Sequence, residues 1–112
     1  MKWQPIAFIS IVILNMLGVF HELAHGLAAL AYGFTWYGIY IGIPYSYVEI
    51  SGSNAVVLAS GGLVQAGIFA ALIWAVLKFQ SLRMTFGGKV FYMLAMMIVF
   101  MVYALIEVIT GV

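Results

Sequence analysis

Three long apolar runs dominate the chain, and they predict three helices. The first covers residues 5–34, the second residues 54–79 and the third residues 89–110. A helix needs roughly 20 consecutive apolar residues to cross a bilayer, and each run is long enough. The pattern therefore predicts an α-helical integral membrane protein, with three transmembrane helices in a single membrane domain over residues 1–112.

Residues 35–53 follow a different pattern from the runs on either side. Aromatic and β-branched residues alternate there with glycines around a central Pro44. Such alternation between turn-forming residues is typical of short strands and not of a helix. We therefore expect a short β-hairpin between the first and second helices.

Composition excludes several classes of protein. Of the 112 residues, 67% are hydrophobic and only 6% are charged, whereas soluble domains carry about 25% charged residues. A net charge of +1 provides no basic surface for nucleic acid. We expect a multi-pass protein of the cell membrane that is surrounded by membrane lipid and has no nucleic-acid partner.

The basic residues indicate an orientation. If the chain crosses the membrane three times, all four basic residues lie at the end of the bundle that holds the N-terminus. These residues are Lys2, Lys78, Arg83 and Lys89. Lysine and arginine are enriched on the cytoplasmic side of membrane proteins. By this rule the N-terminal end is cytoplasmic and the hairpin lies on the opposite side.

Residues 21–25, His-Glu-Leu-Ala-His, form the motif with the clearest chemistry. Histidines four residues apart share one face of a helix, so His21 and His25 can bind one Zn²⁺, while Glu22 lies beside a metal-bound water as a catalytic base. Ionisable residues inside a bilayer are costly and mark functional sites, and no lysine or arginine lies at this depth. A buried histidine pair held by neighbouring helices is the alternative; haem fits poorly, because histidines one turn apart cannot reach both its faces.

A catalytic zinc site usually has a third protein ligand. The chain contains neither cysteine nor aspartate, so this ligand is Glu49, Glu107, an uncharged group or a residue of another subunit. At about 1.5 Å per residue, Glu107 lies roughly 27 Å along the third helix, level with the two histidines at roughly 24 and 30 Å along the first. We therefore expect Glu107 to be the third ligand and Glu49 to be a solvated hairpin carboxylate.

The order of these features resembles the three-helix core of the site-2 protease family, which are intramembrane zinc metalloproteases. The resemblance covers nearly the whole chain and includes the hairpin, which resembles a family element that aligns a substrate strand by edge pairing. In that family two histidines and an aspartate bind zinc, and the glutamate of the HExxH motif is the general base. The resemblance therefore implies zinc binding by His21 and His25 and catalysis by Glu22.

Two other family motifs are altered in this chain. Residues 61–65, Gly-Gly-Leu-Val-Gln, look like a degenerate Gly-Pro-x-x-Asn motif, and they imply a substrate-binding role for Gly61, Gly62 and Gln65. Residues 106–108, Ile-Glu-Val, stand where the family has a Leu-Asp-Gly-type motif. The family also holds this hairpin on the cytosolic side, opposite to the orientation that the basic residues indicate.

Three remaining polar residues have more than one interpretation. Amides inside membrane helices often bond neighbouring helices, which is the role expected for Asn15 and the alternative role for Gln65. Tyr103 lies one turn before Glu107, so its hydroxyl could donate to that carboxylate or to an oxyanion.

The sequence thus predicts an intramembrane zinc metallopeptidase that cleaves peptide bonds of transmembrane protein substrates. One alternative is a non-catalytic accessory subunit that keeps a structural or relic metal site and binds partner subunits in a larger membrane complex. Another is a proton or ion path through the buried ionisable groups, which with three helices would require an oligomer.

Overall fold

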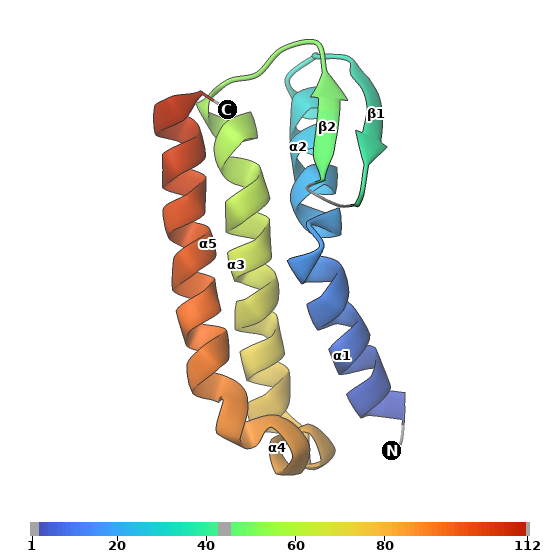
Figure 1. The fold of residues 1–112 in the computed structure, drawn as a ribbon, viewed down its shortest axis with the longest axis vertical. Helices are drawn as coiled ribbons and strands as arrows, with labels where there is room; N and C mark the ends of the chain where they lie inside the picture. Colours follow the sequence, from blue (N-terminus) through green and yellow to red (C-terminus); the bar gives the residue numbers. More distant parts are fainter. Residues whose placement is uncertain (1–2, 43–45, 112) are drawn as a thin grey trace.

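The computed structural model describes residues 3–42 and 46–111, and 77% of this part of the chain is helical. The predicted mostly helical fold with a two-stranded hairpin is confirmed (Figure 1). In chain order the elements are α1 (Trp3–Met16), α2 (Val19–Ala31), β1 (Trp36–Tyr40), β2 (Tyr47–Ile50), α3 (Ala55–Lys78), α4 (Gln80–Phe86), a 3₁₀ turn (Gly87–Lys89) and α5 (Val90–Thr110).

Within the described residues, two helices are long and apolar enough to cross a membrane. They are α3 and the stretch Gln80–Thr110, in which α4 leads into α5. A third span results if α1 and α2 together count as one, although they meet at a bend of 63°. These lengths are compatible with the predicted three-span membrane protein.

The predicted continuous helix over residues 5–34 is wrong, because the chain breaks between α1 and α2. Gly18 adopts a φ of +84°, a left-handed conformation that ends a helix and suits glycine. The Gly18 N–H donates to the Asn15 carbonyl at 3.2 Å, a tight turn in place of a helical one. The helix also ends at Ala31, shortly before Gly33, whose φ is +82°.

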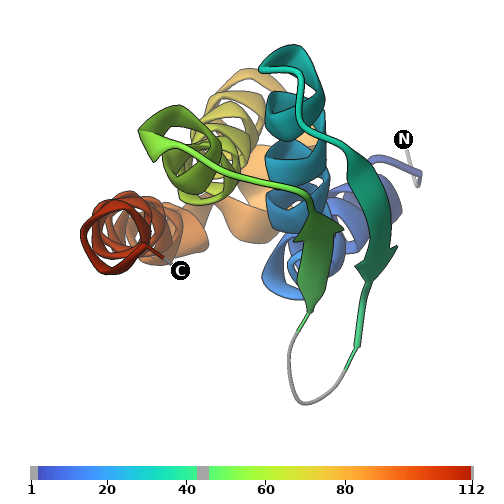
Figure 2. The same ribbon diagram turned by 90° about the horizontal axis from the view of Figure 1, so that it is seen from above.

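The hairpin forms where the sequence predicts it. Strands β1 and β2 pair antiparallel, with Tyr40 opposite Tyr47, and the connecting residues 43–45, Pro44 among them, lie outside the described residues. Gly26 lets the hairpin pack on α2, because a Cβ there would lie 2.4 Å from the Trp36 indole ring. Figure 2 shows the hairpin beside α2, with β2 closer than β1 to α3 and α5.

Helix α3 is central, since it packs on both α2 and α5 (Figure 1). Its contact with α5 is close at Gly62, where a Cβ would lie 2.6 Å from the Phe100 carbonyl oxygen. Away from the hairpin, α1, α3, α4 and α5 share an apolar core, which contains Phe8, Phe69, Leu72, Val76, Leu82 and Met93.

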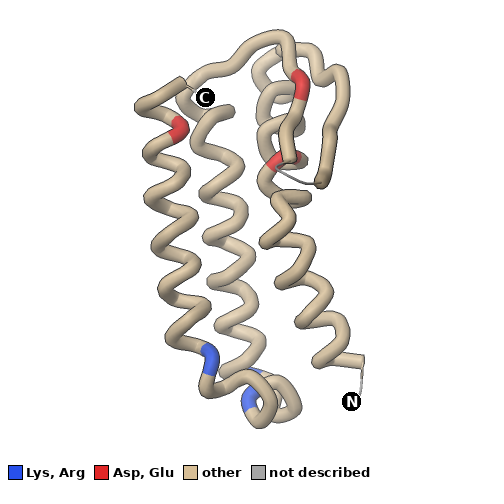
Figure 3. Tube along the Cα trace, viewed as in Figure 1, with Lys and Arg blue, Asp and Glu red and all other residues tan. Residues whose placement is uncertain are grey.

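The polar stretch 80–89 is more ordered than the predicted turn. It forms the short helix α4 and a 3₁₀ turn, and the buried Leu82 anchors α4 in the apolar core. Three of the four basic residues, Lys78, Arg83 and Lys89, lie at this end of the structure, near the N-terminal end of the described chain (Figure 3). Their predicted gathering at one end is confirmed; Lys2 lies outside the described residues.

Candidate metal centre

The predicted ligands His21, His25 and Glu107 converge at one point between α2 and α5. The Nε2 atoms of the two histidines are 2.9 Å apart. Glu107 Oε1 lies 3.1 Å from His21 Nε2, and Glu107 Oε2 lies 3.2 Å from His25 Nε2. All three residues are buried, with exposed fractions between 5% and 8%. Glu107 therefore lies level with the two histidines, as predicted from its depth along the third helix.

The spacing of these atoms fits a small cation. Zinc bonds to nitrogen of about 2.0–2.1 Å in a tetrahedral site place the ligand atoms about 3.3 Å apart. The separations of 2.9 to 3.2 Å are slightly shorter, so a small outward movement of the three side chains would admit the ion. The donor set of two imidazoles and one carboxylate is one that zinc accepts.

The outer nitrogens of both histidines have partners that leave the inner nitrogens free for a metal. His21 Nδ1 lies 2.6 Å from Gln65 Oε1, and His25 Nδ1 lies 2.6 Å from the Val57 carbonyl oxygen. Because carbonyl oxygens only accept, each Nδ1 donates its N–H, and a neutral ring then has its lone pair on Nε2. Histidine ligands of metals show this arrangement almost always.

The centre therefore brings together atoms that only accept. The two Nε2 lone pairs meet the Glu107 carboxylate, and Glu107 Oε1 has no hydrogen-bond donor within the described part of the chain. Acceptors held this closely in a buried site repel one another unless a cation or a proton lies among them. The geometry of these acceptor atoms therefore supports a cation site.

Gly61 provides the space for this centre. A Cβ on Gly61 would lie 2.6 Å from His25 Nε2 and 2.7 Å from both Cε1 and Nε2 of His21. No larger residue could occupy the position without moving the rings. Gly61 thus contacts the histidines and Gly62 contacts α5, while the substrate-binding role predicted for both stays a prediction.

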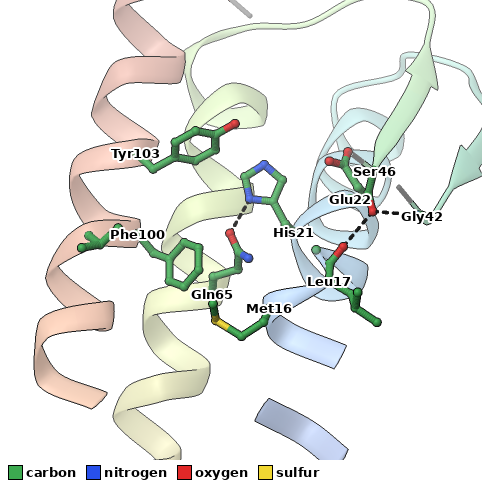
Figure 4. Close-up of a pocket in the computed structure, with 11 residues that line it drawn as sticks. Met16, Leu17, His21, Glu22, Gly42, Ser46, Gln65, Phe100 and Tyr103 are labelled. Atoms are coloured by element: carbon green, nitrogen blue, oxygen red, sulfur yellow. Dashed lines mark hydrogen bonds between the residues drawn. The ribbon is translucent and has the colours of Figure 1, made fainter. Parts of the chain in front are cut away.

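Glu22 lies beside the centre and outside the group of converging ligands. Its side chain is buried, comes from the same helix as the two histidines and lies near Ser46 (Figure 4). It lines two cavities, of about 410 and 470 Å³, together with His21, Ser46 and Tyr103. A carboxylate that faces space and does not join the ligand cluster can exchange a proton with a molecule in that space.

The two cavities reach the centre from different directions. The smaller one opens along the helix break, past Met16 and Gly18, toward Phe100 of α5. The larger one lies between the helices and strand β2, with Val48 and Ile50 in its lining. Their sizes fall in the range of small-molecule sites, about 300–1,000 Å³. The larger cavity therefore connects the centre with strand β2.

The structure also places Asn15, Tyr103 and Glu49, the other polar residues considered from the sequence. Asn15 is fully buried and its amide donates to the Gln65 carbonyl at 3.3 Å, which confirms the predicted bond between helices. Tyr103 lines both cavities with its ring centroid 5.5 Å from that of His21. Glu49 is exposed on β2, apart from the ligand group, as predicted.

Two contributors to the site were missed from the sequence. The Val57 carbonyl is a backbone group, so no residue type could signal its role. Ser46 donates to the Leu17 carbonyl at 2.7 Å and so fastens the hairpin to the helix break beside Glu22 (Figure 4). The sequence did not single out Ser46, because serine is a common residue in turns and hairpins.

Comparisons of the chain with known protein families, with curated proteins and with solved structures find no match.

Proposed function

We propose that the protein is an intramembrane zinc metallopeptidase, similar to the site-2 protease family, that hydrolyses peptide bonds of membrane-embedded protein substrates. One observation carries the proposal: two imidazole nitrogens and a carboxylate converge within 3.2 Å of one another, and a separate buried carboxylate lies beside them. The long apolar helices support a location in the membrane.

The ligands for zinc would be His21 Nε2, His25 Nε2 and the Glu107 carboxylate. When bound, zinc supplies Lewis-acid activation of water and of the peptide carbonyl. Three protein ligands leave a fourth position open, as catalytic zinc sites require. The Nδ1 hydrogen bonds of both histidines keep each ring turned so that its Nε2 would be available to the ion.

Glu22 would transfer the proton. Its carboxylate accepts a proton from the attacking water as the oxygen–carbon bond forms, and it returns the proton to the leaving amide nitrogen as the carbon–nitrogen bond breaks. The net reaction consumes one water and produces one carboxyl and one amino terminus. The burial of Glu22, and its place in the lining of both cavities, support this role.

The test compares Glu22→Gln with Glu49→Gln, a matched control on the exposed face of the hairpin. Zinc content is measured on detergent-purified protein, and cleavage of a defined set of transmembrane peptides is followed by mass spectrometry. We expect one zinc per chain in all three proteins, and cleavage at least about 100-fold slower in Glu22→Gln alone, since general-base catalysis contributes about 10²–10⁴-fold.

Unchanged cleavage by Glu22→Gln, or wild-type protein without zinc, would contradict the proposal. Bound zinc without any cleavage, combined with a loss of stability in His21→Ala, would favour the accessory subunit with a structural metal site.

A further inference from the structure

The side-chain amide of Gln65 joins three parts of the structure. Gln65 lies on α3 and is buried, with an exposed fraction of 4%. Its Nε2 donates to the Asn15 carbonyl at the end of α1, at 2.9 Å. Its Oε1 accepts the His21 Nδ1 hydrogen bond from α2, at 2.6 Å (Figure 4). Each end of the amide thus has a different partner.

The Asn15 carbonyl determines which end of the amide faces His21. A backbone carbonyl can only accept, so the NH₂ group of Gln65 must point to Asn15 and the oxygen must point to His21. The carbonyl is available because α1 breaks there, at the left-handed Gly18. It receives both the Gly18 N–H at 3.2 Å and the Gln65 amide. The helix break therefore provides the acceptor that orients Gln65.

The orientation of Gln65 in turn determines the tautomer of His21. With an oxygen opposite Nδ1, the neutral ring carries its proton on Nδ1 and its lone pair on Nε2, the atom 2.9 Å from His25 Nε2. The tautomer of His25 is set in the same way by the Val57 backbone carbonyl, which no side-chain substitution removes. His21 differs, because a single replaceable side chain controls its tautomer.

We propose that Gln65 is a positioning residue for the metal centre: oriented by the Asn15 carbonyl at the helix break, it holds His21 in the Nδ1–H tautomer with Nε2 free to bind the ion. The inference rests on the metal site of the proposed function, but it does not require peptidase activity. It gives Gln65 a role in ligand orientation, in place of the substrate contact that the motif resemblance implied.

Asn15 offers a matched control. Its own side chain also crosses between the two helices, where Nδ2 donates to the Gln65 backbone carbonyl at 3.3 Å. Asn15→Leu removes that bond and leaves the Asn15 carbonyl in place, so Gln65 stays oriented. A purely structural amide contact would make Asn15→Leu and Gln65→Met equivalent, whereas a positioning role makes them differ.

The first measurement is the tautomer. Nitrogen-15 NMR of the histidine side chains is recorded on metal-free wild-type, Gln65→Met, Gln65→Glu and Asn15→Leu proteins, at a pH where the imidazoles are neutral. We expect Nδ1–H for both histidines in the wild type. In Gln65→Met His21 should change toward Nε2–H while His25 does not. Gln65→Glu, which keeps an acceptor oxygen, and Asn15→Leu should keep the wild-type spectrum.

The second measurement is zinc affinity, by competition with a chelator. Loss of such an outer partner typically weakens metal binding about 10–100-fold, which is the effect expected for Gln65→Met. Gln65→Glu should recover most of the affinity, and Asn15→Leu should stay close to the wild type.

The proposal is overturned if wild-type His21 carries its proton on Nε2, a result that needs no variant to fold. It is also overturned if Gln65→Met leaves the tautomer unchanged, or if Asn15→Leu weakens zinc binding as much as Gln65→Met does. Failure of the wild type to bind zinc would instead refute the proposed function, and the tautomer comparison would still decide the role of Gln65.

Discussion

At the scale of single residues, the centre depends on small groups that hold the ligands in place. The His25 ring is fixed by the Val57 carbonyl and the His21 ring by Gln65. Gly61 is equally important, since the space over its Cα holds both inner nitrogens. The geometry of the three ligands is therefore a property of their surroundings as much as of the ligands themselves.

Gly61→Ala tests this at one residue. The added Cβ would lie 2.6–2.7 Å from the two rings, so the rings must move. We expect a loss of zinc affinity and a destabilisation of about 1–3 kcal/mol, as for other overpacked sites. Chelator competition and thermal unfolding in detergent measure the two effects.

Gly67→Ala is the control on the same helix, because no other part of the described chain comes within 4 Å of its Cβ position. It should leave zinc affinity unchanged and stability unchanged or slightly raised, since alanine favours a helix by about 1 kcal/mol over glycine. Equal effects of the two substitutions on zinc binding would show that Gly61 does not shape the centre.

The convergence of His21, His25 and Glu107 was predictable from the sequence, but the partners that hold the two histidine rings were not. The four-residue spacing of His21 and His25, together with simple depth arithmetic for Glu107, was sufficient to bring the three ligands together. The partners of the two histidines lie 44 and 32 residues away in the chain, and neither contact follows from local spacing. Only the packing of α2 on α3 brings them within reach.

At the scale of elements, the break between α1 and α2 shapes the site. It frees the carbonyl oxygens of Asn15 and Leu17, which accept from Gln65 and Ser46 respectively. Through these two hydrogen bonds, α3 and the hairpin are both attached to the 63° bend from which α2, the helix of His21 and His25, begins. A straight helix would use these carbonyls in its own hydrogen bonds.

Gly18→Ala tests the role of the break. Alanine at a φ of +84° costs about 1–2 kcal/mol, which favours straightening of the bend and withdraws the Asn15 carbonyl from Gln65. We expect lower stability and weaker zinc binding. Gly33→Ala is the matched control, because it introduces a similar backbone strain at a φ of +82° beyond the end of α2. It should lower stability by a similar amount and leave zinc affinity unchanged. Equal zinc affinities in the two variants would show that the helix break does not influence zinc binding.

Hydropathy alone located the helices and the hairpin, since apolar runs and alternating residues are direct signals. It did not locate the break, because a glycine inside an apolar run fits close helix packing as well as a left-handed turn. Gly62 and Gly26 are in fact packing glycines, whereas Gly18 takes the left-handed conformation that breaks the first apolar run. Nor did it find α4, whose polar residues resemble a turn although the buried Leu82 secures a helix.

At the scale of the whole molecule, charge and chemistry lie at opposite ends. The described basic residues gather around α4, while all three glutamates lie in the half that holds the hairpin (Figure 3). The ligands come from α2 and α5, which both pack on α3, so an ion in the centre would link the first and last parts of the bundle. Zinc would therefore contribute to the fold as well as to the chemistry.

The most direct test of the account is a crystal structure of the purified full chain with anomalous diffraction data collected on both sides of the zinc absorption edge. We expect one zinc peak per chain, bonded to His21 Nε2, His25 Nε2 and the Glu107 carboxylate, with Glu22 beside it but not bonded. A zinc-supplemented crystal that has no peak among these side chains, or has Glu107 turned away from both rings, would contradict it.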